Sequence, residues 1–394
     1  MKGGELKSAS PPSVFPGVER YGNYLVLTGG NVPALWGALY SAVTQKHLLV
    51  VLPPSSAMEK DVLLRQLPKA PPAQAVLALF TSGTTGEPKA VFHSEKSLLT
   101  SAEQLAKAFP GNSPTCSLLS PWGMAGVVFH CLLPAMRGSD VIFSSASFSE
   151  WAGEAGDIFT REKVELVTLN PFLLEMWLRM GGTGDWAGRA VSLTAPLREA
   201  QKAEFRQESR ASLLEIYGLT EAAGPVLLEG KSLGSSLKLS DAGELLLSGD
   251  QLLLGYGEQG EFREAGPWYS TGDIFEQRED SSFVHLSRER ELIDLSGRKV
   301  APRLIEAAFE SMEELAECLA FGKEIAGVER VALVYVRKPH CQLSEKQLSA
   351  KVEERAKEML SQELWPHLWR ELKKVPRSSS GKPDRRKLVE TKLD

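Results

Sequence analysis

The chain has 394 residues, 43% of them hydrophobic, which is enough for a large core and two or three folding units. Its formal net charge of −5 argues against nucleic acid as the main partner. Four widely separated cysteines without a Cys-x-x-Cys pair favour free thiols in a reducing compartment: Cys116, Cys131, Cys318 and Cys341. With no signal-peptide core at residues 1–17 and no apolar stretch that could span a bilayer, we expect a cytoplasmic protein without a membrane span.

The N-terminal part of the chain predicts a βαβ unit. Residues 24–27 form one apolar strand pattern and residues 47–52 a second. Between them, Asn31 can cap a helix that runs through Gln45. A strand, a helix and a strand in this order predict a right-handed crossover and a parallel sheet.

A loop rich in glycine and hydroxyl side chains follows, between strand patterns at 75–80 and 90–93. Glycine lets backbone N–H groups approach an anion closely, and hydroxyls add donors, so the loop suits phosphate oxygens. Pro88 precedes the lysine and a strand follows, which differs from the helix-opening Walker loop. The alternative is a polar surface turn. The candidate binding residues are Thr81, Ser82, Gly83, Thr84, Thr85, Gly86 and Lys89.

Strand and helix patterns alternate beyond the loop, with a helix at 94–108 and strands at 115–120, 140–143, 164–170, 191–193 and 213–216. Short strands at 243–249, 252–256 and 283–286 then predict a small antiparallel β unit. The rest reads as a separate α+β domain with helices at 304–309 and 345–363 and strands at 317–322 and 331–337. We therefore expect an α/β fold: a large N-terminal domain of parallel-sheet layers plus the β unit, and a small mobile C-terminal α+β domain.

Residues 215–221 end a predicted strand in a glycine turn that presents three polar side chains. Tyr217 can stack on a purine, Thr220 can donate to a phosphate, and Glu221 can hold Mg²⁺. The Thr-Glu pair suits a helix N-cap equally well.

Two further segments carry charge near the predicted domain boundary. In Thr271-Gly272-Asp273 the carboxylate can accept both hydroxyls of a ribose, although an Asx turn is the alternative. The run of alternating charge at 287–302 is, taken alone, typical of a solvated segment.

Near the C-terminus, residues 375–386 form a basic, glycine-containing loop around Lys382. A frayed basic tail is the alternative interpretation. A mobile ammonium could instead stabilise the charge that builds up on a reacting phosphate.

In this order, the motifs resemble those of the AMP-forming adenylating superfamily, which includes acyl- and aryl-CoA synthetases, peptide-synthetase adenylation domains and luciferases. The resemblance implies activation of a small carboxylic acid as an acyl-adenylate and its transfer to a thiol, with ATP, Mg²⁺ and coenzyme A. It places an adenylate-forming domain with a shortened first subdomain at residues 1–287 and a swinging domain at 288–394. A homodimer stays open, and no nucleic acid is expected.

The resemblance also assigns roles to individual residues. Lys382 becomes the catalytic lysine, with Thr220 on the α-phosphate and Glu221 on magnesium as its catalytic partners. Tyr217 lies on the adenine, Asp273 and Arg288 contact the ribose, and Arg290 takes the hinge position. The remaining ATP- or AMP-binding residues are the loop residues above together with Gly218 and the segment Thr194, Ala195 and Pro196, which replaces the usual Gly-Gly-Ala.

The substrate is constrained by the segment 120–126, where the resemblance places the acyl pocket, with Trp122, Met124 and Gly126. No aspartate is available there to hold an ammonium, which argues against free amino acids, and the aromatic-His pair of many ligases is missing. The short first subdomain resembles o-succinylbenzoate–CoA ligases of menaquinone biosynthesis most. Another aryl or medium-chain acyl-CoA ligase stays open, as does a relative that adenylates or binds nucleotide without forming a thioester, because Asp294 and Leu304 depart from the pattern for thiolation.

Overall fold

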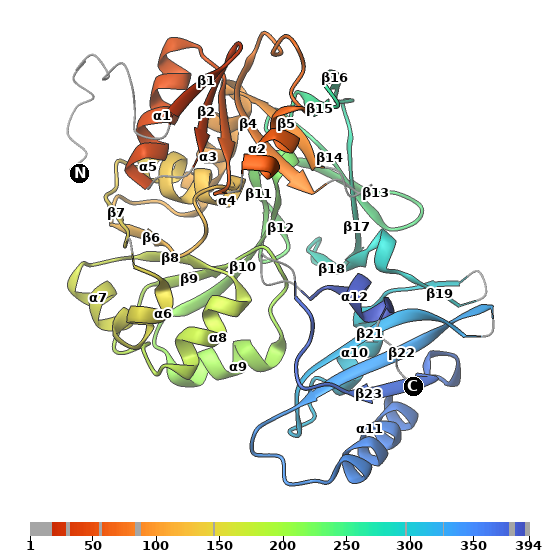
Figure 1. Cartoon of the computed structure of the whole chain (residues 1–394). Helices are drawn as coiled ribbons and strands as arrows, with labels where there is room; N and C mark the ends of the chain where they lie inside the picture. The colour runs from red at the N-terminus through yellow and green to blue at the C-terminus, as the bar shows by residue number, and fades with distance from the viewer. Residues whose placement is uncertain are drawn as a thin grey trace. The chain divides into compact units, whose positions relative to one another are not determined.

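The computed structural model describes residues 18–28, 32–54, 57–82, 88–144, 146–295, 298–325, 327–377 and 383–390, with the side chains of residues 57, 58, 82 and 386 excepted. The chain divides into two compact units (Figure 1). Unit 1 comprises Met1–Leu197, Ala203–Leu237 and Leu247–Tyr269; unit 2 comprises Arg198–Lys202, Lys238–Leu246 and Ser270–Asp394. Among the described residues, no helix is long and apolar enough to cross a membrane.

The first sheet of unit 1 has seven strands in the order β1-β2-β3-β4-β5-β15-β16. β2 and β3 are parallel neighbours, and helix α1 connects them along the chain, which confirms the predicted βαβ unit. β4 and β5 are antiparallel and flank the glycine-rich loop, as predicted. The elements are β1 (Val18–Tyr21), β2 (Tyr24–Thr28), α1 (Val32–Gln45), β3 (Leu49–Leu52), α2 (Ala57–Leu64), β4 (Ala75–Ser82), β5 (Pro88–Ser94), β15 (Gly255–Glu258) and β16 (Glu261–Glu264).

Strand β15 lies outside the small β unit in which the sequence placed it. It pairs with β5 instead, and Gly257 lies opposite Ala90. A Cβ atom at Gly257 would come within 2.9 Å of the Phe92 ring and of the Gln66 carbonyl oxygen. Glycine therefore allows this close approach of two strands, a partner choice that the local alternation of β15 does not specify.

The second sheet of unit 1 has the order β12-β11-β10-β9-β8-β6-β7, with β7, β6, β8, β9 and β10 parallel. The predicted strands at 115–120, 140–143, 164–170, 191–193 and 213–216 are all present. The strands are β6 (Thr115–Ser117), β7 (Val141–Ile142), β8 (Leu166–Leu169), β9 (Arg189–Ser192), β10 (Ser212–Leu219), β11 (Gly224–Leu228) and β12 (Lys231–Ser232). The helices are α3 (Glu95–Ala108), α4 (Met124–Gly126), the π-helix Val127–Leu132, α5 (Leu133–Arg137), α6 (Phe148–Trp151), α7 (Ala155–Arg161), α8 (Pro171–Arg179) and α9 (Glu199–Glu208).

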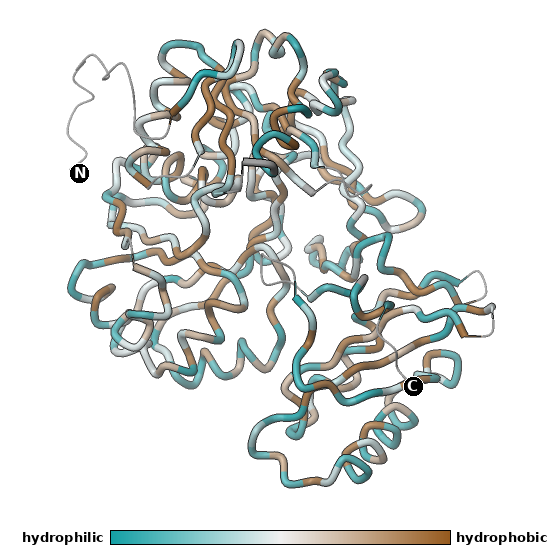
Figure 2. The backbone as a smooth tube through the Cα atoms, viewed as in Figure 1, coloured by the Kyte–Doolittle hydropathy of each residue, from teal (hydrophilic) through white to brown (hydrophobic). Residues whose placement is uncertain are grey.

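Alternate residues of the second sheet belong to two different hydrophobic cores, as the period of a strand requires. Leu166 and Val191 pack with α3, α5 and the first sheet, whereas Val167 and Ala190 pack with aromatic side chains of α7 and α8. The hydrophobic segments in Figure 2 follow the strands of both sheets. Because both faces are covered, the carboxyl ends of the parallel strands stay available for a ligand.

Unit 2 contains most of a four-stranded sheet in the order β13-β14-β17-β18, which confirms the small β unit at 243–249 and 283–286. Its C-terminal part has a hairpin, a three-stranded sheet and a core that joins α10, α11 and β22. The elements are β13 (Ser236–Leu239), β14 (Glu244–Ser248), β17 (Tyr269–Gln277), β18 (Phe283–Arg288), β19 (Ile293–Leu295), β20 (Arg298–Val300), α10 (Pro302–Glu306), β21 (Leu315–Ile325), β22 (Val328–Arg337), α11 (Glu345–Met359), β23 (Leu368–Glu371) and α12 (Arg385–Glu390).

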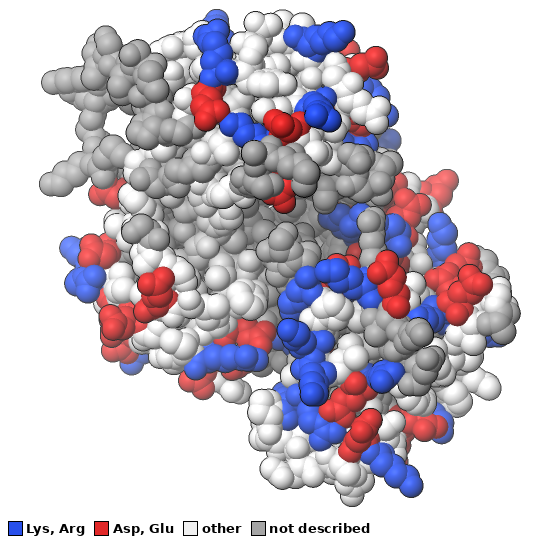
Figure 3. Space-filling view, in the orientation of Figure 1, with Lys and Arg blue, Asp and Glu red and all other residues white. Residues whose placement is uncertain are grey.

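The predicted α/β fold class is confirmed, with one helix shorter than expected. Helix α11 was predicted through residue 363 but ends at Met359, because Leu360 adopts an extended conformation. The sequence predicted that a swinging C-terminal domain begins at residue 288. This boundary stays a prediction. Figure 3 shows acidic and basic side chains interspersed on the visible faces of both units, in keeping with 45 Lys and Arg against 50 Asp and Glu.

Candidate active site

The predicted phosphate loop is framed by the β4–β5 hairpin of unit 1. Thr81 and Lys89 lie opposite each other across the two strands. The Lys89 ammonium is 2.5 Å from a Glu258 carboxylate oxygen and 5.6 Å from the centroid of the Tyr256 ring. Gly83, Thr84, Thr85, Gly86 and the side chain of Ser82 lie outside the described residues. The structure thus places the lysine of the motif against strand β15.

The motif at 217–221 forms the end of β10 and the 3-10 turn Thr220–Ala222. Gly218 is needed here because a Cβ atom would lie 2.5 Å from the Gly224 carbonyl oxygen. Two hydrogen bonds fix the turn: the Leu253 N–H donates to the Glu221 carbonyl (2.8 Å), and the Ser101 hydroxyl donates to the Ala223 carbonyl (2.8 Å). The turn is therefore bound to neighbouring elements on both sides.

A buried histidine, His93, supports the same turn and was not predicted as a functional residue. It is fully buried at the end of β5, lies beside the Thr220 backbone, and has Nδ1 3.4 Å from the Ser97 hydroxyl oxygen. Burial lowers the pKa of His93 to about 4, against the smaller opposing effect of the neighbouring Thr220 backbone. The imidazole is therefore neutral at pH 7. A polar residue inside an otherwise apolar strand was the available signal.

The Glu221 carboxylate lies beside two tyrosines of unit 1. The Tyr256 hydroxyl is 3.3 Å from Glu221 Oε1 and 3.1 Å from the Tyr269 hydroxyl. Burial, and next the charge of Glu221, raises the pKa of both tyrosines, so both remain protonated donors. Sequence reasoning assigned neither tyrosine to the site.

The environment of Glu221 fits a magnesium ion that arrives with a nucleotide. Among the described residues, no group of three His, Cys, Asp or Glu side chains is arranged to hold a metal. Mg²⁺ is usually bound through one or two carboxylates plus substrate phosphates rather than by an all-protein cage. A single oriented carboxylate near the phosphate hairpin meets that requirement.

The segment Thr194–Pro196 lies at the carboxyl edge of the second sheet, beside the Tyr217 turn. Ser192 pairs with Glu215 in parallel strands, so both chains leave the sheet at the same edge. The Leu197 N–H donates to a Glu215 carboxylate oxygen at 2.8 Å. Thr194 is exposed and has φ +77°, a left-handed conformation that is unusual for a β-branched residue.

The predicted acyl-pocket residues lie at the start of a helix that contains a π-turn, Val127–Leu132. Trp122 is half-buried, whereas Met124 and Gly126 are buried, and a Cβ atom on Gly126 would overlap the Ser120 carbonyl oxygen. Gly224, which follows the Thr220 turn, is packed against Met124 and Val128. The segment therefore adjoins the turn that carries Glu221.

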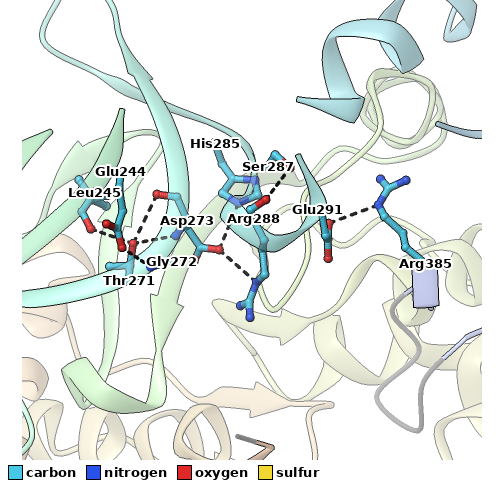
Figure 4. Close-up of polar contacts among 10 residues, drawn as sticks. All are labelled: Glu244, Leu245, Thr271, Gly272, Asp273, His285, Ser287, Arg288, Glu291 and Arg385. Atoms are coloured by element: carbon cyan, nitrogen blue, oxygen red, sulfur yellow. Dashed lines mark hydrogen bonds and ion pairs between the residues drawn. The ribbon is translucent and has the colours of Figure 1, made fainter. Parts of the chain in front are cut away.

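In unit 2 the structure brings together Asp273 and Arg288, which the sequence had assigned to one ribose (Figure 4). Asp273 is 3% exposed, and Arg288 Nε lies 3.1 Å from Asp273 Oδ1. His285 Nε2 lies 3.6 Å from the same oxygen. The Asp273 N–H donates to the Thr271 hydroxyl at 3.0 Å, so threonine rather than aspartate closes the turn. Arg290 is exposed in the 3-10 turn Glu289–Glu291.

Lys382 lies outside the described residues, but both flanks of its loop are held together in unit 2. Arg377 forms a β-bridge with Pro383, and its guanidinium is 2.7 Å from Glu317. Arg385, just beyond the lysine, lies 2.8 Å from Glu306 and 3.3 Å from Glu291 and donates to the Ala320 carbonyl at 2.6 Å. The arginine of the motif is thus a structural anchor, a role that sequence reasoning did not assign.

The AMP-binding enzyme family matches residues 37–257, which is more than half of the chain. The chain belongs to this family. The match confirms the predicted AMP-forming adenylating superfamily. A curated relative, sulfoacetate–CoA ligase from Cupriavidus necator, is 26% identical over 359 residues, covering 82% of this chain and 68% of the relative. Other curated CoA ligases are matched over about half of their length, such as 53% for a 4-coumarate–CoA ligase of Arabidopsis thaliana.

Solved structures of family members share the fold. The anthranilate CoA ligase AuaEII in complex with anthranoyl-AMP is 19% identical and has a TM-score of 0.69, covering 93% of this chain and 78% of its own. The o-succinylbenzoate coenzyme A synthetase of Bacillus subtilis in complex with ATP and magnesium is also 19% identical, with a TM-score of 0.65 and coverage of 80% and 70%. At these identities the likeness establishes the fold, and the choice of acid does not follow from it.

Proposed function

We propose that the protein is an ATP-dependent carboxylate–CoA ligase that forms an acyl-adenylate and then an acyl-CoA thioester. The observation that carries the proposal is the arrangement around Tyr256, where the lysine of the phosphate motif and the carboxylate of the Thr-Glu motif approach the same ring and hydroxyl. A basic group for phosphate oxygens and an oxygen ligand for magnesium at one place are what binding of Mg·ATP requires.

In the first half-reaction, a carboxylate oxygen of the acid attacks the α-phosphorus of ATP. The bond between that phosphorus and the oxygen bridging to the β-phosphate breaks, and pyrophosphate leaves. Thr220 and Lys89 donate to phosphate oxygens, Tyr217 lies on the adenine, and the Asp273 carboxylate accepts the ribose hydroxyls beside Arg288. Lys382 stabilises the negative charge of the transition state. Glu221 would hold the magnesium ion, which would supply positive charge to the phosphate oxygens.

In the second half-reaction, the thiol of coenzyme A attacks the acyl carbon of the mixed anhydride, and AMP leaves. This step rests on the family's rotation about the hinge position, here Arg290. The exposure of Arg290 in a short turn supports such a role. Asp294 and Leu304 depart from the family's pattern for this step. Adenylation without thioester formation is therefore the second candidate function.

For the acid we propose an aromatic carboxylate such as o-succinylbenzoate. The half-buried Trp122 beside buried Met124 supports an apolar or aromatic acyl group. Curated relatives named for 4-coumarate and 2-succinylbenzoate support this choice, whereas the sulfoacetate ligase represents a different acid. Another aryl or medium-chain acyl-CoA ligase is the alternative.

The test is a screen of o-succinylbenzoate, benzoate derivatives and medium-chain acids in two assays. Acid-dependent ATP–pyrophosphate exchange reports adenylation, and thioester formation with coenzyme A reports the complete reaction. We expect both activities, with the highest rate for an aromatic acid. Exchange without thioester would favour the second candidate function, and the absence of exchange with every acid would refute the proposal.

A further inference from the structure

Two polar side chains of strand β15 contact residues that are predicted to bind the nucleotide. Tyr256 and Glu258 are two residues apart and therefore project from the same face of the strand. The other face carries Gly255 and Gly257, where a Cβ atom would overlap the Arg263 carbonyl or approach Phe92. Only glycine fits on that face, so the pairing register of β15 cannot shift by one residue. The side chains of Tyr256 and Glu258 must therefore point to the opposite face.

Tyr256 makes a directed contact with Glu221. Its hydroxyl has one proton and lies near both the Glu221 carboxylate (3.3 Å) and the Tyr269 hydroxyl (3.1 Å). A carboxylate can only accept, so Tyr256 donates to Glu221 and accepts from Tyr269. The two tyrosines form a chain of hydrogen bonds that ends on the carboxylate and restricts its rotation.

Glu258 makes the corresponding contact with Lys89. The carboxylate and ammonium are 2.5 Å apart, and their side chains are 37% and 20% exposed. The ammonium also faces the Tyr256 ring at 5.6 Å. Held by an anion on one side and an aromatic ring on the other, the lysine has a defined position at the base of the phosphate hairpin.

We infer that β15 is the positioning strand of the nucleotide site. Tyr256, supported by Tyr269, orients Glu221 for the magnesium that accompanies ATP, and Glu258 positions the Lys89 ammonium for a phosphate. Both residues act through the group that they hold. The inference rests on the proposed function, because it assumes that Mg·ATP binds at Glu221 and Lys89.

The first test measures equilibrium binding of ATP as a function of magnesium concentration. In Tyr256→Phe we expect the magnesium concentration at half-saturation to rise about tenfold, the size of effect typical for loss of a group that orients a metal ligand. Binding of ATP without magnesium should stay unchanged. Tyr335→Phe, which removes a buried hydroxyl from the core of unit 2, is the matched control and should keep the wild-type curve.

The same experiment distinguishes failure of the proposed function from failure of the positioning role of Tyr256. If the wild-type chain does not bind ATP at any magnesium concentration, the proposed function falls and the inference falls with it. If it binds, and Tyr256→Phe shows the same magnesium dependence as wild type, only the positioning role of Tyr256 is overturned.

The second test is a double-mutant cycle on ATP affinity. Glu258→Ala should weaken ATP binding several-fold in the wild-type background but have no further effect in Lys89→Met, because its action passes through the lysine. A purely structural role of Glu258 would weaken binding equally in both backgrounds and would overturn the inference. Thermal unfolding of each variant checks that the fold is retained.

Discussion

At the scale of single residues, Thr194 shows how a local conformation marks the candidate site. Its φ of +77° places a β-branched side chain in the left-handed region, where strain of about 1–3 kcal/mol is usual. The sequence identified Thr194 as a departure from the family's glycine, but the strained backbone could not be predicted from the residue type. Strain of this kind collects at ligand-binding sites, which agrees with the role proposed for residues 194–196.

We predict that Thr194→Gly does not destabilise the fold. Relief of the left-handed strain, about 1–2 kcal/mol, should outweigh the greater flexibility of glycine in the unfolded chain, about 0.5–1 kcal/mol. The free energy of unfolding in urea should therefore stay equal or rise by up to about 1 kcal/mol. Thr44→Gly, at an exposed position of helix α1, should instead lower it. A clear loss of stability in Thr194→Gly would contradict the argument.

A second prediction concerns Lys382, whose role stays a prediction from the sequence. Because its charge acts on the transition state, Lys382→Ala should slow ATP–pyrophosphate exchange at least 100-fold while ATP binding changes little. Lys374→Ala, at an exposed lysine near the same loop, should keep the wild-type rate. An unchanged exchange rate in Lys382→Ala would refute the assignment.

At the scale of secondary-structure elements, the sequence specified which segments form strands far better than which strands pair. The apolar runs at 75–80 and 164–170 are strands as predicted, because a short continuous apolar run is typical of a buried strand. The pairing of β15 with β5 depends on Gly257, which fits against Phe92 although the two residues are 165 positions apart. Likewise, His93 stood out as a polar residue in an apolar strand, but its position beside the Thr220 turn could not be predicted.

His93 leads to a prediction about pH. Burial lowers the pKa of His93 to about 4 in the folded chain, whereas in the unfolded chain the imidazole has its ordinary pKa of 6.5. At pH values between these two, the unfolded chain therefore binds a proton that the folded chain does not. Stability from this residue is complete above pH 6.5 and is lost as the pH falls toward 4. Between pH 7 and pH 5 the loss is about 2 kcal/mol.

The measurement is urea unfolding at pH 7 and pH 5. His93→Gln, which has no imidazole to protonate, should lose less stability than wild type over this interval by about 2 kcal/mol. His47→Gln, at an exposed position, serves as the control and should follow wild type. Parallel pH profiles for His93→Gln and wild type would exclude this effect of His93.

At the scale of the whole molecule, the residues that the resemblance assigns to nucleotide binding occur in both units. Lys89, Tyr217 and Glu221 belong to unit 1, whereas Asp273 and Arg288 belong to unit 2. The sequence predicted two domains and the order of the motifs along them, since each motif is local. It could not predict the contacts inside each unit that hold these residues, because those contacts join distant segments.

The hinge assignment predicts that the two half-reactions can be separated. Proline at position 290 fixes φ and removes a backbone N–H, so Arg290→Pro should hinder rotation of the C-terminal part. Thioester formation should fall at least tenfold, while ATP–pyrophosphate exchange stays within about threefold of wild type. Arg290→Ala, which leaves the backbone free, is the control. Equal losses in both assays would argue against a hinge at this residue.

The anchoring of Arg385 has a mechanical consequence. This guanidinium joins Glu291, directly after the proposed hinge, to Glu306 of α10 and to the Ala320 carbonyl of β21. The proposed rotation of the C-terminal part must therefore pivot at or before Arg290. Glu291, α10, β21 and the start of α12 would then move together as one rigid body, because Arg385 joins them.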